Sequence, residues 1–299
     1  MLNQLHLLFT YACTKECDHC FVYSSPSAKG TFTLNQVRDI LAEAVKIYSI
    51  DWIYFEGGEP FLYFPIMVEA MSLAKELGFK IGLVTNGYWI TSQEDAEIYL
   101  NILKKIGIDD FCVSDDCYHN EGTNNQLGLL VKEIAQKLDI SINIISLEEP
   151  KVINEPITSL KGKPIIGGNV RFIGRAVENL TYGLPKQPWE NLRACIHEEL
   201  EFPTRVHLDP FGNVHICQGL VIGNFLKTPL SDIINNYNPQ VNGILKALIK
   251  GGPAALAKTF NAVHADSYVD ECHFCFDVRR VLQRHFTDTL APPQIYGIK

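Results

Sequence analysis

The most informative part of the chain is Phe9-Thr10-Tyr11-Ala12-Cys13-Thr14-Lys15-Glu16-Cys17-Asp18-His19-Cys20-Phe21, which places three cysteines at the spacing C-x3-C-x2-C. It directly follows a short apolar run, Leu5–Phe9, that is typical of a β-strand. Cysteine thiolates hold iron–sulfur clusters, normally with four cysteines for a 4Fe–4S cluster. Three close thiolates can hold three irons and leave the fourth open to a small molecule, as a catalytic zinc keeps one open position. A structural zinc site or plain buried thiols are the alternatives.

The cysteine spacing resembles the signature of the radical S-adenosylmethionine (radical SAM) superfamily, C-x3-C-x-φ-C with φ aromatic. Here φ is His19, a permitted but less common choice. The resemblance implies that SAM chelates the fourth iron of a [4Fe-4S] cluster held by Cys13, Cys17 and Cys20. It also implies that one electron, from a flavodoxin- or ferredoxin-type reductant, cleaves the S–C5′ bond and gives a 5′-deoxyadenosyl radical.

The composition is that of a globular protein with an acidic balance. The 299 residues suit one large domain, or such a domain with an appendage, and 46% hydrophobic residues are ample for a core. The net charge of −8 argues against a large nucleic-acid interface. No apolar run approaches the roughly 18 residues of a membrane span, and the N-terminus lacks a signal-peptide core. We therefore expect a cytoplasmic protein without a membrane or nucleic-acid partner, whose nine cysteines serve metal sites rather than disulfides.

Short β-branched or aromatic runs alternate with helical patterns from residue 5 to about 175. The six predicted strands are Leu5–Phe9, Trp52–Phe55, Ile81–Thr85, Ile108–Ser114, Ile140–Ser146 and Val170–Ile173. Repeated βα units predict a parallel sheet covered by helices. Six units fit an α/β fold with an incomplete (β/α)6 TIM-like barrel, the architecture that the resemblance also implies.

The helices between these strands have clear start and stop signals. Thr33 and Gln36 form a capping box for the first helix. Thr91 or Ser92 can cap a later helix, and Gly107 ends that helix.

A glycine-rich turn, Glu56-Gly57-Gly58-Glu59-Pro60, follows the second predicted strand. Two glycines let the backbone approach a ligand closely or adopt positive φ. Taken alone this is an ordinary turn, but the radical SAM superfamily has its GGE motif at the same place. The resemblance implies that Gly57, Gly58, Glu59 and Pro60 bind the methionyl amino group of SAM, with Glu59 as the main polar contact.

Polar residues follow the third and fourth predicted strands. Active sites of parallel barrels lie at the C-terminal ends of the strands. The resemblance implies contacts from these positions to the ribose and carboxylate of SAM, and our candidates are Asn86, Ser114 and Asp115. A simple Asn-Gly turn at Asn86 and a helix cap at Asp115-Asp116 are the alternatives.

Tyr118 and His119 are candidate catalytic residues, because they would sit near the barrel mouth where substrate must reach C5′ of the adenosyl group. Two surface loop residues are the plainer interpretation. Cys117 would also point near the mouth, whereas Cys112 is a buried small hydrophobe on its strand.

The segment Arg171-Phe172-Ile173-Gly174-Arg175-Ala176 resembles the G-R-A stretch that often closes the barrel in radical SAM proteins with an auxiliary cluster domain. We expect Arg171 and Arg175 at a strand end, and Arg175 among the cofactor-binding residues. Guanidinium groups suit a carboxylate or phosphate, although both arginines can simply pair on the surface.

Four further cysteines lie beyond the predicted barrel domain of residues 1–180, in a second domain of residues 181–299. Residues 206–217 are typical of two short strands around a Pro-Phe-Gly-Asn turn, and a terminal helix follows the Cys-x2-Cys pair. One cysteine before the hairpin, one on it and two at the helix start can converge on one site: Cys195, Cys217, Cys272 and Cys275. A structural zinc and a fully ligated 4Fe–4S cluster both satisfy this set.

This arrangement resembles the SPASM/twitch extension of radical SAM enzymes, with Gly212 and Cys217 as its Gly-x4-Cys element. No cysteine follows Cys275, so the count excludes the longer form with two auxiliary clusters. The resemblance implies the twitch form, a small β-hairpin/helix domain with one auxiliary [4Fe-4S] cluster, followed by a C-terminal tail.

As a whole, the resemblance implies a radical SAM enzyme, an oxidoreductase or modifying enzyme that reductively cleaves SAM and abstracts a hydrogen atom from a peptide or a small molecule. Because the first predicted strand starts at residue 5, we expect no fused N-terminal peptide-recognition domain. Arg171 and Arg175 would suit an anionic metabolite. The alternative is a non-catalytic iron–sulfur or zinc protein that binds SAM or a partner.

Overall fold

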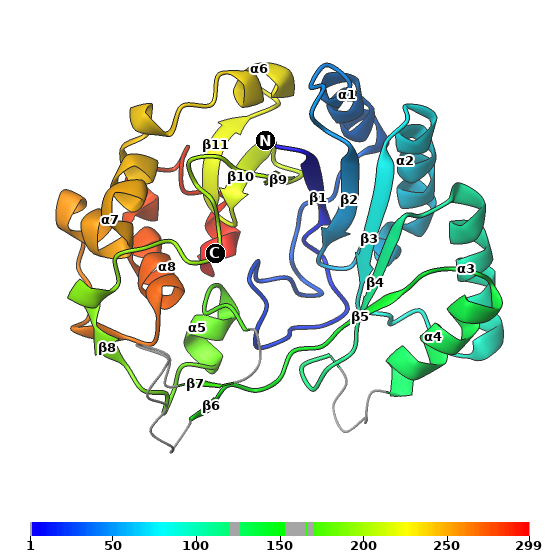
Figure 1. The fold of residues 1–299 in the computed structure, drawn as a ribbon, viewed down its shortest axis with the longest axis horizontal. Helices are drawn as coiled ribbons and strands as arrows, with labels where there is room; N and C mark the ends of the chain where they lie inside the picture. Colours follow the sequence, from blue (N-terminus) through cyan, green and yellow to red (C-terminus); the bar gives the residue numbers. More distant parts are fainter. Residues whose placement is uncertain (1, 120–125, 153–164, 167–169, 299) are drawn as a thin grey trace.

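One eight-stranded sheet runs through the molecule in the order β11–β10–β9–β1–β2–β3–β4–β5 (Figure 1). The computed structural model describes residues 2–119, 126–152, 165–166 and 170–298. The strands from β9 to β5 are parallel to their neighbours, and β10 and β11 extend the sheet in antiparallel fashion beyond β9. The protein is therefore an α/β fold with a mostly parallel central sheet. Its strands are β1 (Gln4–Thr10), β2 (Trp52–Gly57), β3 (Lys80–Thr85), β4 (Asp110–Ser114), β5 (Asn143–Ile145), β9 (Arg205–Leu208), β10 (Asn213–Cys217) and β11 (Leu220–Asn224).

Four helices cover the outer face of β1–β5: α1 (Leu34–Ala44), α2 (Phe64–Glu76), α3 (Gln93–Ile106) and α4 (Gln126–Lys137) (Figure 1). Leu5, Leu7 and Phe9 of β1 are fully buried in the core beneath these helices. Because side chains alternate along a strand, His6 lies on the opposite face of the sheet. That inner face carries the polar residues discussed below.

The predicted helix signals are confirmed at both ends of this region. Thr33 accepts a hydrogen bond from the backbone of Gln36 at 3.2 Å, and Gln36 accepts one from the backbone of Thr33 at 2.9 Å. Ser92 caps α3, which ends at Gly107 with φ of 78°.

The helices of the C-terminal half are α5 (Arg175–Asn179), α6 (Leu230–Asn235), α7 (Gly243–Phe260) and α8 (Glu271–Leu282). A second core lies beside β9–β11 and is formed mainly by α7 and α8 of the C-terminal half, whereas α6 packs on the first core (Figure 1). The backbone leaves helical geometry inside α7 at Gly251 and Gly252. Short two-residue strands form two separate antiparallel pairs, β6 (Lys151–Val152) with β7 (Ile165–Ile166), and β8 (Gln187–Pro188) with β12 (Ser267–Tyr268). Single 3-10 turns complete the chain at Pro60–Tyr63, Trp189–Asn191, Pro239–Val241, Gln283–His285 and Pro293–Tyr296.

One predicted strand is wrong. Val170–Ile173 is not a strand, because residues 170–173 form an irregular segment that leads into α5. The strand that pairs with β1 on the side away from β2 is β9. It runs parallel to β1 and places Val206 opposite Leu5. The predicted hairpin is confirmed as β9 and β10, and β9 joins it to the main sheet by pairing with β1. Pairing between strands that are far apart in the sequence leaves no local periodic pattern, so the sequence does not predict the β1–β9 pair.

Within the described part of the chain, no helix combines the length and the apolar character needed to cross a membrane.

Candidate functional site

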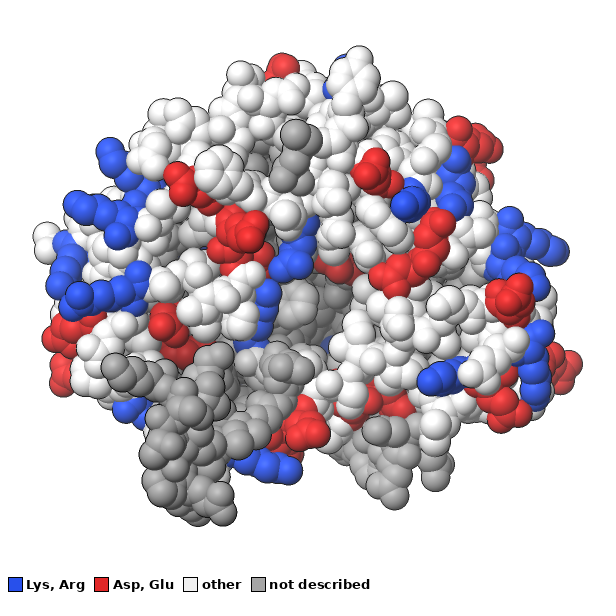
Figure 2. All heavy atoms as spheres, in the orientation of Figure 1, with Lys and Arg blue, Asp and Glu red and all other residues white. Residues whose placement is uncertain are grey.

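One cavity of about 330 Å³ brings together side chains from the cysteine loop and from the ends of β2, β3 and β4. The surface is hollowed near the middle of the face in Figure 2, with basic and acidic side chains at its edge. The C-terminal ends of parallel strands are the usual place for a site in such a sheet. The predicted site residues that line the cavity are Cys13, Cys17, His19, Cys20, Gly57, Gly58, Asn86, Ser114 and His119.

The three cysteines lie on a loop that is held by its own backbone. The backbone N–H of Cys13 donates to the carbonyl of Ser25 at 3.0 Å, and that of Cys20 donates to the carbonyl of Cys17 at 3.1 Å. Backbone N–H groups of Lys15 and Ser24 lie 3.4 and 3.3 Å from the sulfurs of Cys13 and Cys20. Burial, and then the neighbouring thiols, raise the pKa of Cys17 to about 12, so metal binding here must release protons.

The glycine-rich turn after β2 packs directly on the backbone that leads into Cys13. The N–H of Gly58 donates to the carbonyl of Thr10 at 2.6 Å, and that of Glu59 donates to the carbonyl of Ala12 at 2.9 Å. A Cβ on Gly58 would lie 2.2 Å from the oxygen of Ala12, and Gly57 has φ of +134°. Both glycines are therefore needed for this close approach.

Glu59 lies behind the cavity, not in its lining. Its fully buried carboxylate accepts hydrogen bonds from the N–H of Phe61 at 3.0 Å, the hydroxyl of Thr85 at 2.8 Å and the N–H of Asn86 at 2.7 Å. Burial raises its pKa to about 7 against the opposing effect of these donors. Pro60 is also buried and begins the 3-10 turn after β2. Through these hydrogen bonds, Glu59 connects the end of β2 to the end of β3.

Asn86 reaches the cysteine loop from the end of β3. Its side-chain amide donates to the hydroxyl of Thr14 at 3.1 Å and lies 3.5 Å from the sulfur of Cys13. Ser114 lines the cavity from the end of β4. Asp115, by contrast, is fully buried and accepts a hydrogen bond from the N–H of Gly128 in α4 at 2.6 Å.

Asp116 is one of the cavity residues that the sequence pattern does not predict, because Asp115-Asp116 looks like a helix cap. It lines the cavity, and its carboxylate lies 2.7 Å from Nδ1 of His119. The backbone N–H groups of Tyr118, His119 and Leu147 also donate to it, each at 3.1 Å. The Asp-x-x-His spacing was the available signal, since it allows a side chain to orient a histidine three residues later.

The aromatic rings of His19, Tyr118 and His119 lie close together at the cysteine loop. The ring of His19 lies 4.8 Å from that of Tyr118 and 5.0 Å from that of His119. Burial, and then His119, lower the pKa of His19 to about 4, so His19 is neutral near pH 7. Tyr118 is outside the cavity lining, and Cys117 is exposed.

Arg175 holds the cysteine loop from outside the cavity, which corrects its predicted place at a strand end. Its guanidinium donates to the carbonyls of Cys17, at 2.7 Å, and Ser24, and its backbone N–H donates to the carbonyl of Cys20 at 2.9 Å. Gly174 makes this contact possible, because a Cβ there would lie 2.4 Å from the oxygen of Cys20. The Gly-Arg pair therefore acts on the backbone of the loop.

The four C-terminal cysteines line a second, smaller cavity of about 30 Å³: Cys195, Cys217, Cys272 and Cys275. Cys272 and Cys275 lie in the first turns of α8, so the predicted place of these two cysteines at a helix start is confirmed. The fully buried Arg279 also lines this cavity and provides a positive charge next to the sulfurs. Arg171 lines both cavities and pairs with Glu198, so the two cavities are neighbours.

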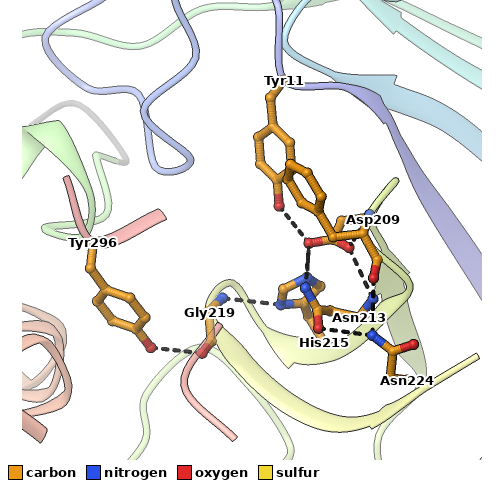
Figure 3. Close-up of polar contacts among 8 residues, drawn as sticks. Tyr11, Asp209, Asn213, His215, Gly219, Asn224 and Tyr296 are labelled. Atoms are coloured by element: carbon orange, nitrogen blue, oxygen red, sulfur yellow. Dashed lines mark hydrogen bonds and ion pairs between the residues drawn. The ribbon is translucent and has the colours of Figure 1, made fainter. Parts of the chain in front are cut away.

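A buried polar network connects the two cysteine regions (Figure 3). The carboxylate of Asp209, at the end of β9, accepts hydrogen bonds from the hydroxyl of Tyr11 at 3.0 Å and from Nε2 of His215 at 3.1 Å. Asn213 donates to the same carboxylate at 3.0 Å. Tyr11 is two residues before Cys13, and His215 is two residues before Cys217.

Part of the chain is similar to proteins of a known family. Residues 7–140 match the family model of the radical SAM superfamily. A protein of Bacillus subtilis (strain 168) that is named for peptide biosynthesis is 28% identical over 158 residues, 52% of this chain and 49% of that protein. One of Methanocaldococcus jannaschii that is named as a glycyl-radical enzyme activating enzyme is 32% identical over 88 residues, 29% of this chain and 33% of that protein. The chain thus spans half or less of the length of these relatives.

A solved structure of similar fold is that of BtrN in complex with AdoMet and 2-DOIA. It has a TM-score of 0.57 and 16% sequence identity, over 91% of this chain and 92% of that chain. At this identity the likeness concerns the fold alone.

Proposed function

Because residues 7–140 form a radical SAM superfamily domain, we propose that this protein is a radical SAM enzyme. It would cleave S-adenosylmethionine reductively and abstract a hydrogen atom from a substrate. The observation that carries the proposal is that Cys13, Cys17 and Cys20 line the same cavity as Gly57 and Gly58. The cysteine motif and the glycine-rich turn are far apart in the sequence. A ligand bound by both would explain why they line the same cavity.

The residues around this cavity fit a [4Fe-4S] cluster with one open iron. Three cysteines line it, and two of their sulfurs face backbone N–H groups at 3.3 and 3.4 Å, which stabilise thiolates. When bound on Cys13, Cys17 and Cys20, the cluster would supply the electron for cleavage of SAM. A flavodoxin- or ferredoxin-type reductant is the proposed partner.

The surrounding side chains would bind SAM and exclude water from the reaction. The backbone of the Gly57–Pro60 turn would face the methionyl amino group, with Glu59 holding that turn in place. Asn86 and Ser114 would contact the polar groups of SAM from the ends of β3 and β4. His119, oriented by Asp116, would face the substrate, and the rings of His19 and Tyr118 would shield the cluster side.

For the C-terminal cysteines we propose one auxiliary [4Fe-4S] cluster in a twitch-like domain over residues 181–299, next to a partial barrel over residues 1–180. A tetrahedral zinc with bonds of about 2.3 Å holds its thiolates about 3.8 Å apart. Among the described residues, no three of the cysteines place their sulfurs within 4.8 Å of one another. This wider spacing supports a cluster over a single zinc ion. The shared lining residue Arg171 supports electron transfer between the two cavities.

A peptide is the substrate class that the comparisons favour, because the Bacillus subtilis relative is named for peptide biosynthesis. An anionic small molecule is the second candidate. It is favoured by Lys15 and Arg171, two basic residues that line the first cavity.

The first prediction concerns turnover of SAM. Anaerobically reconstituted protein, with SAM and dithionite, should produce 5′-deoxyadenosine, measured by mass spectrometry. Cys17→Ala should abolish this product and lower the iron content from about eight to about four per chain, because only the first cluster loses a ligand. The exposed Cys117 is the matched control, and Cys117→Ala should keep both the product and the iron.

Retained SAM cleavage in Cys17→Ala would exclude the proposed cluster. Absence of 5′-deoxyadenosine from wild-type protein that carries about eight irons would favour a non-catalytic iron–sulfur protein.

A further inference from the structure

A third group of candidate metal ligands, besides the two cysteine groups, lies on three neighbouring strands of the inner face of the sheet. It consists of His6 on β1, Glu56 on β2 and His207 on β9. His6 and His207 stand opposite each other in the parallel β1–β9 pair. One donor atom from each of the three lies within 4.8 Å of the other two, and no other group of three among the described residues meets this criterion. None of the cysteines discussed above belongs to this group.

The separations between these donor atoms suit a shared ion. Nδ1 of His6 lies 3.2 Å from one carboxylate oxygen of Glu56, and Nε2 of His207 lies 3.3 Å from the other. Metal bonds of about 2.1 Å to nitrogen and oxygen put neighbouring ligand atoms about 3.0 to 3.4 Å apart in octahedral or tetrahedral geometry. Charge-assisted hydrogen bonds are shorter, about 2.7 to 2.9 Å.

The hydrogen bonds of the two imidazoles leave bare nitrogens facing the carboxylate. Nε2 of His6 lies 3.2 Å from the amide oxygen of Gln4, which can only accept, so Nε2 carries the hydrogen. Nδ1 of His6 is buried without a hydrogen-bond partner. Nε2 of His207 lies 3.4 Å from the side-chain nitrogen of Gln218, a donor, so Nε2 carries no hydrogen, and its one lone pair can turn from this long contact to an ion. A bare imidazole nitrogen facing the partly buried carboxylate of Glu56 repels it unless a cation, either a proton or a metal ion, lies between them.

The positive charge of the neighbouring Arg205 does not lie between the imidazoles and Glu56, because it is paired with another carboxylate. Arg205 on β9 is a cationic neighbour of Glu56 and His207, and its guanidinium forms two bonds of 3.1 Å to the carboxylate of Glu198. Tyr54 stacks on His6 with ring centroids 4.4 Å apart and supplies no charge. Glu56 itself lines the 330 Å³ cavity, so an ion bound to it has one side directed at that space.

We propose that His6, Glu56 and His207 bind one divalent transition-metal ion, separate from the cysteine-bound groups. Two imidazoles and one carboxylate form the ligand set of catalytic zinc and non-haem iron(II) sites, which keep positions open for water or substrate. The bond from His6 to Gln4 supports the site, because ligating histidines usually donate their other ring N–H to an acceptor. The open positions would face the cavity and take an oxygen or nitrogen donor.

Binding of Mn²⁺ to the reconstituted holoprotein tests this site, because Mn²⁺ prefers oxygen and nitrogen ligands over thiolates. The loss of the free Mn²⁺ signal in electron paramagnetic resonance should give one ion per chain. Glu56→Gln and His207→Gln should each weaken the binding at least 10-fold, by analogy with roughly 10- to 100-fold losses for supporting residues. Pulsed measurements should show nitrogen coupling from two imidazoles, and from one in His207→Gln.

The exposed His285 provides a matched control, and His285→Gln should bind Mn²⁺ as the wild type does. Circular dichroism and iron content report whether each variant folds. Should the ligand variants fail to fold, Gln4→Ala removes only the partner of His6 and should still weaken binding several-fold. Absence of bound Mn²⁺ at millimolar concentration, or equal affinity in wild type, Glu56→Gln and Gln4→Ala, would overturn the proposal. None of these outcomes depends on turnover of SAM.

Discussion

Glu59 shows how one buried side chain can organise the ends of two strands. Its carboxylate receives the N–H of Phe61, the hydroxyl of Thr85 and the N–H of Asn86, and no part of it is exposed. Three donors favour the ionised form, but burial is the larger effect and raises the pKa to about 7. Folding therefore makes this carboxyl group harder to ionise than in the unfolded chain.

The second prediction concerns the pH dependence of stability. Since the pKa of Glu59 in the folded protein is raised from 4.5 to about 7, the folded state binds more protons between these values. The free energy of unfolding should then fall as pH rises, by up to about 3 kcal/mol, a limit set by roughly 1.4 kcal/mol per pKa unit. Glu59→Gln should remove this slope in urea unfolding followed by circular dichroism from pH 5 to 8.

The difference in unfolding free energy between wild type and Glu59→Gln isolates this residue from other titrating groups. The exposed Glu76→Gln serves as the control and should leave the wild-type slope unchanged. A wild-type advantage that grows with pH would contradict the raised pKa.

The turn between β2 and the 3-10 helix at Pro60–Tyr63 is the element that supports the cysteine loop. Its contacts are backbone to backbone, from Gly58 to Thr10 and from Glu59 to Ala12. Such contacts require that the turn carries no side chain on the facing side, which explains the two adjacent glycines.

The third prediction tests that contact. In Gly58→Ala the added Cβ would lie 2.2 Å from the carbonyl oxygen of Ala12, which belongs to the backbone and cannot rotate away. The turn must then retreat from the loop, and overpacking of this kind costs about 1 to 3 kcal/mol. We expect lower unfolding free energy and reduced iron on the first three cysteines, measured by Mössbauer spectroscopy.

Gly243→Ala is the matched control for this variant. Gly243 is the first residue of α7, and a Cβ there would meet only the ring of Phe260 at 3.4 Å. Alanine should be neutral or stabilise the helix by up to about 1 kcal/mol. Equal losses of iron in both variants would show that the turn has no special role.

At the scale of the whole molecule, Asp209 connects the segment before Cys13 to the segment before Cys217, through its hydrogen bonds with Tyr11 and His215 (Figure 3). Burial alone would raise its pKa, but hydrogen bonds from His215 and Asn213 outweigh burial and hold the pKa below its usual range. The stabilisation from this carboxylate is therefore present above the unfolded pKa of about 3.8 and is lost as pH falls through the lower folded value.

The fourth prediction concerns both cysteine regions at once. Asp209→Asn turns an acceptor-only group into one with an N–H2 that faces other donors, and the loss should be about 3 kcal/mol of unfolding free energy near pH 7. Because Tyr11 and His215 each precede a cysteine by two residues, iron on both groups should fall together. Tyr11→Phe removes one hydrogen bond and should cost about 1 kcal/mol. Full iron on both groups in Asp209→Asn would contradict the coupling.

The amino-acid sequence alone was sufficient where the signal is local. The capping box of Thr33 and Gln36, the cap at Ser92 and the β9–β10 hairpin depend on neighbours a few residues away, and the structure contains all of them. The cysteine spacing likewise identified the loop that lines the main cavity. Such features follow from local hydrogen bonding and side-chain spacing, which a short stretch of chain contains completely.

Only the tertiary structure settled which distant groups meet. It paired β9 with β1, placed Glu59 and Asp115 behind the cavity and Asp116 in it, and directed Arg175 to the cysteine loop. Asp115 and Asp116 look alike in the sequence, but beyond the end of β4 one bonds to α4 and the other faces the cavity. Which side faces a cavity, and which donors arrive there, depends on packing between segments far apart in the chain.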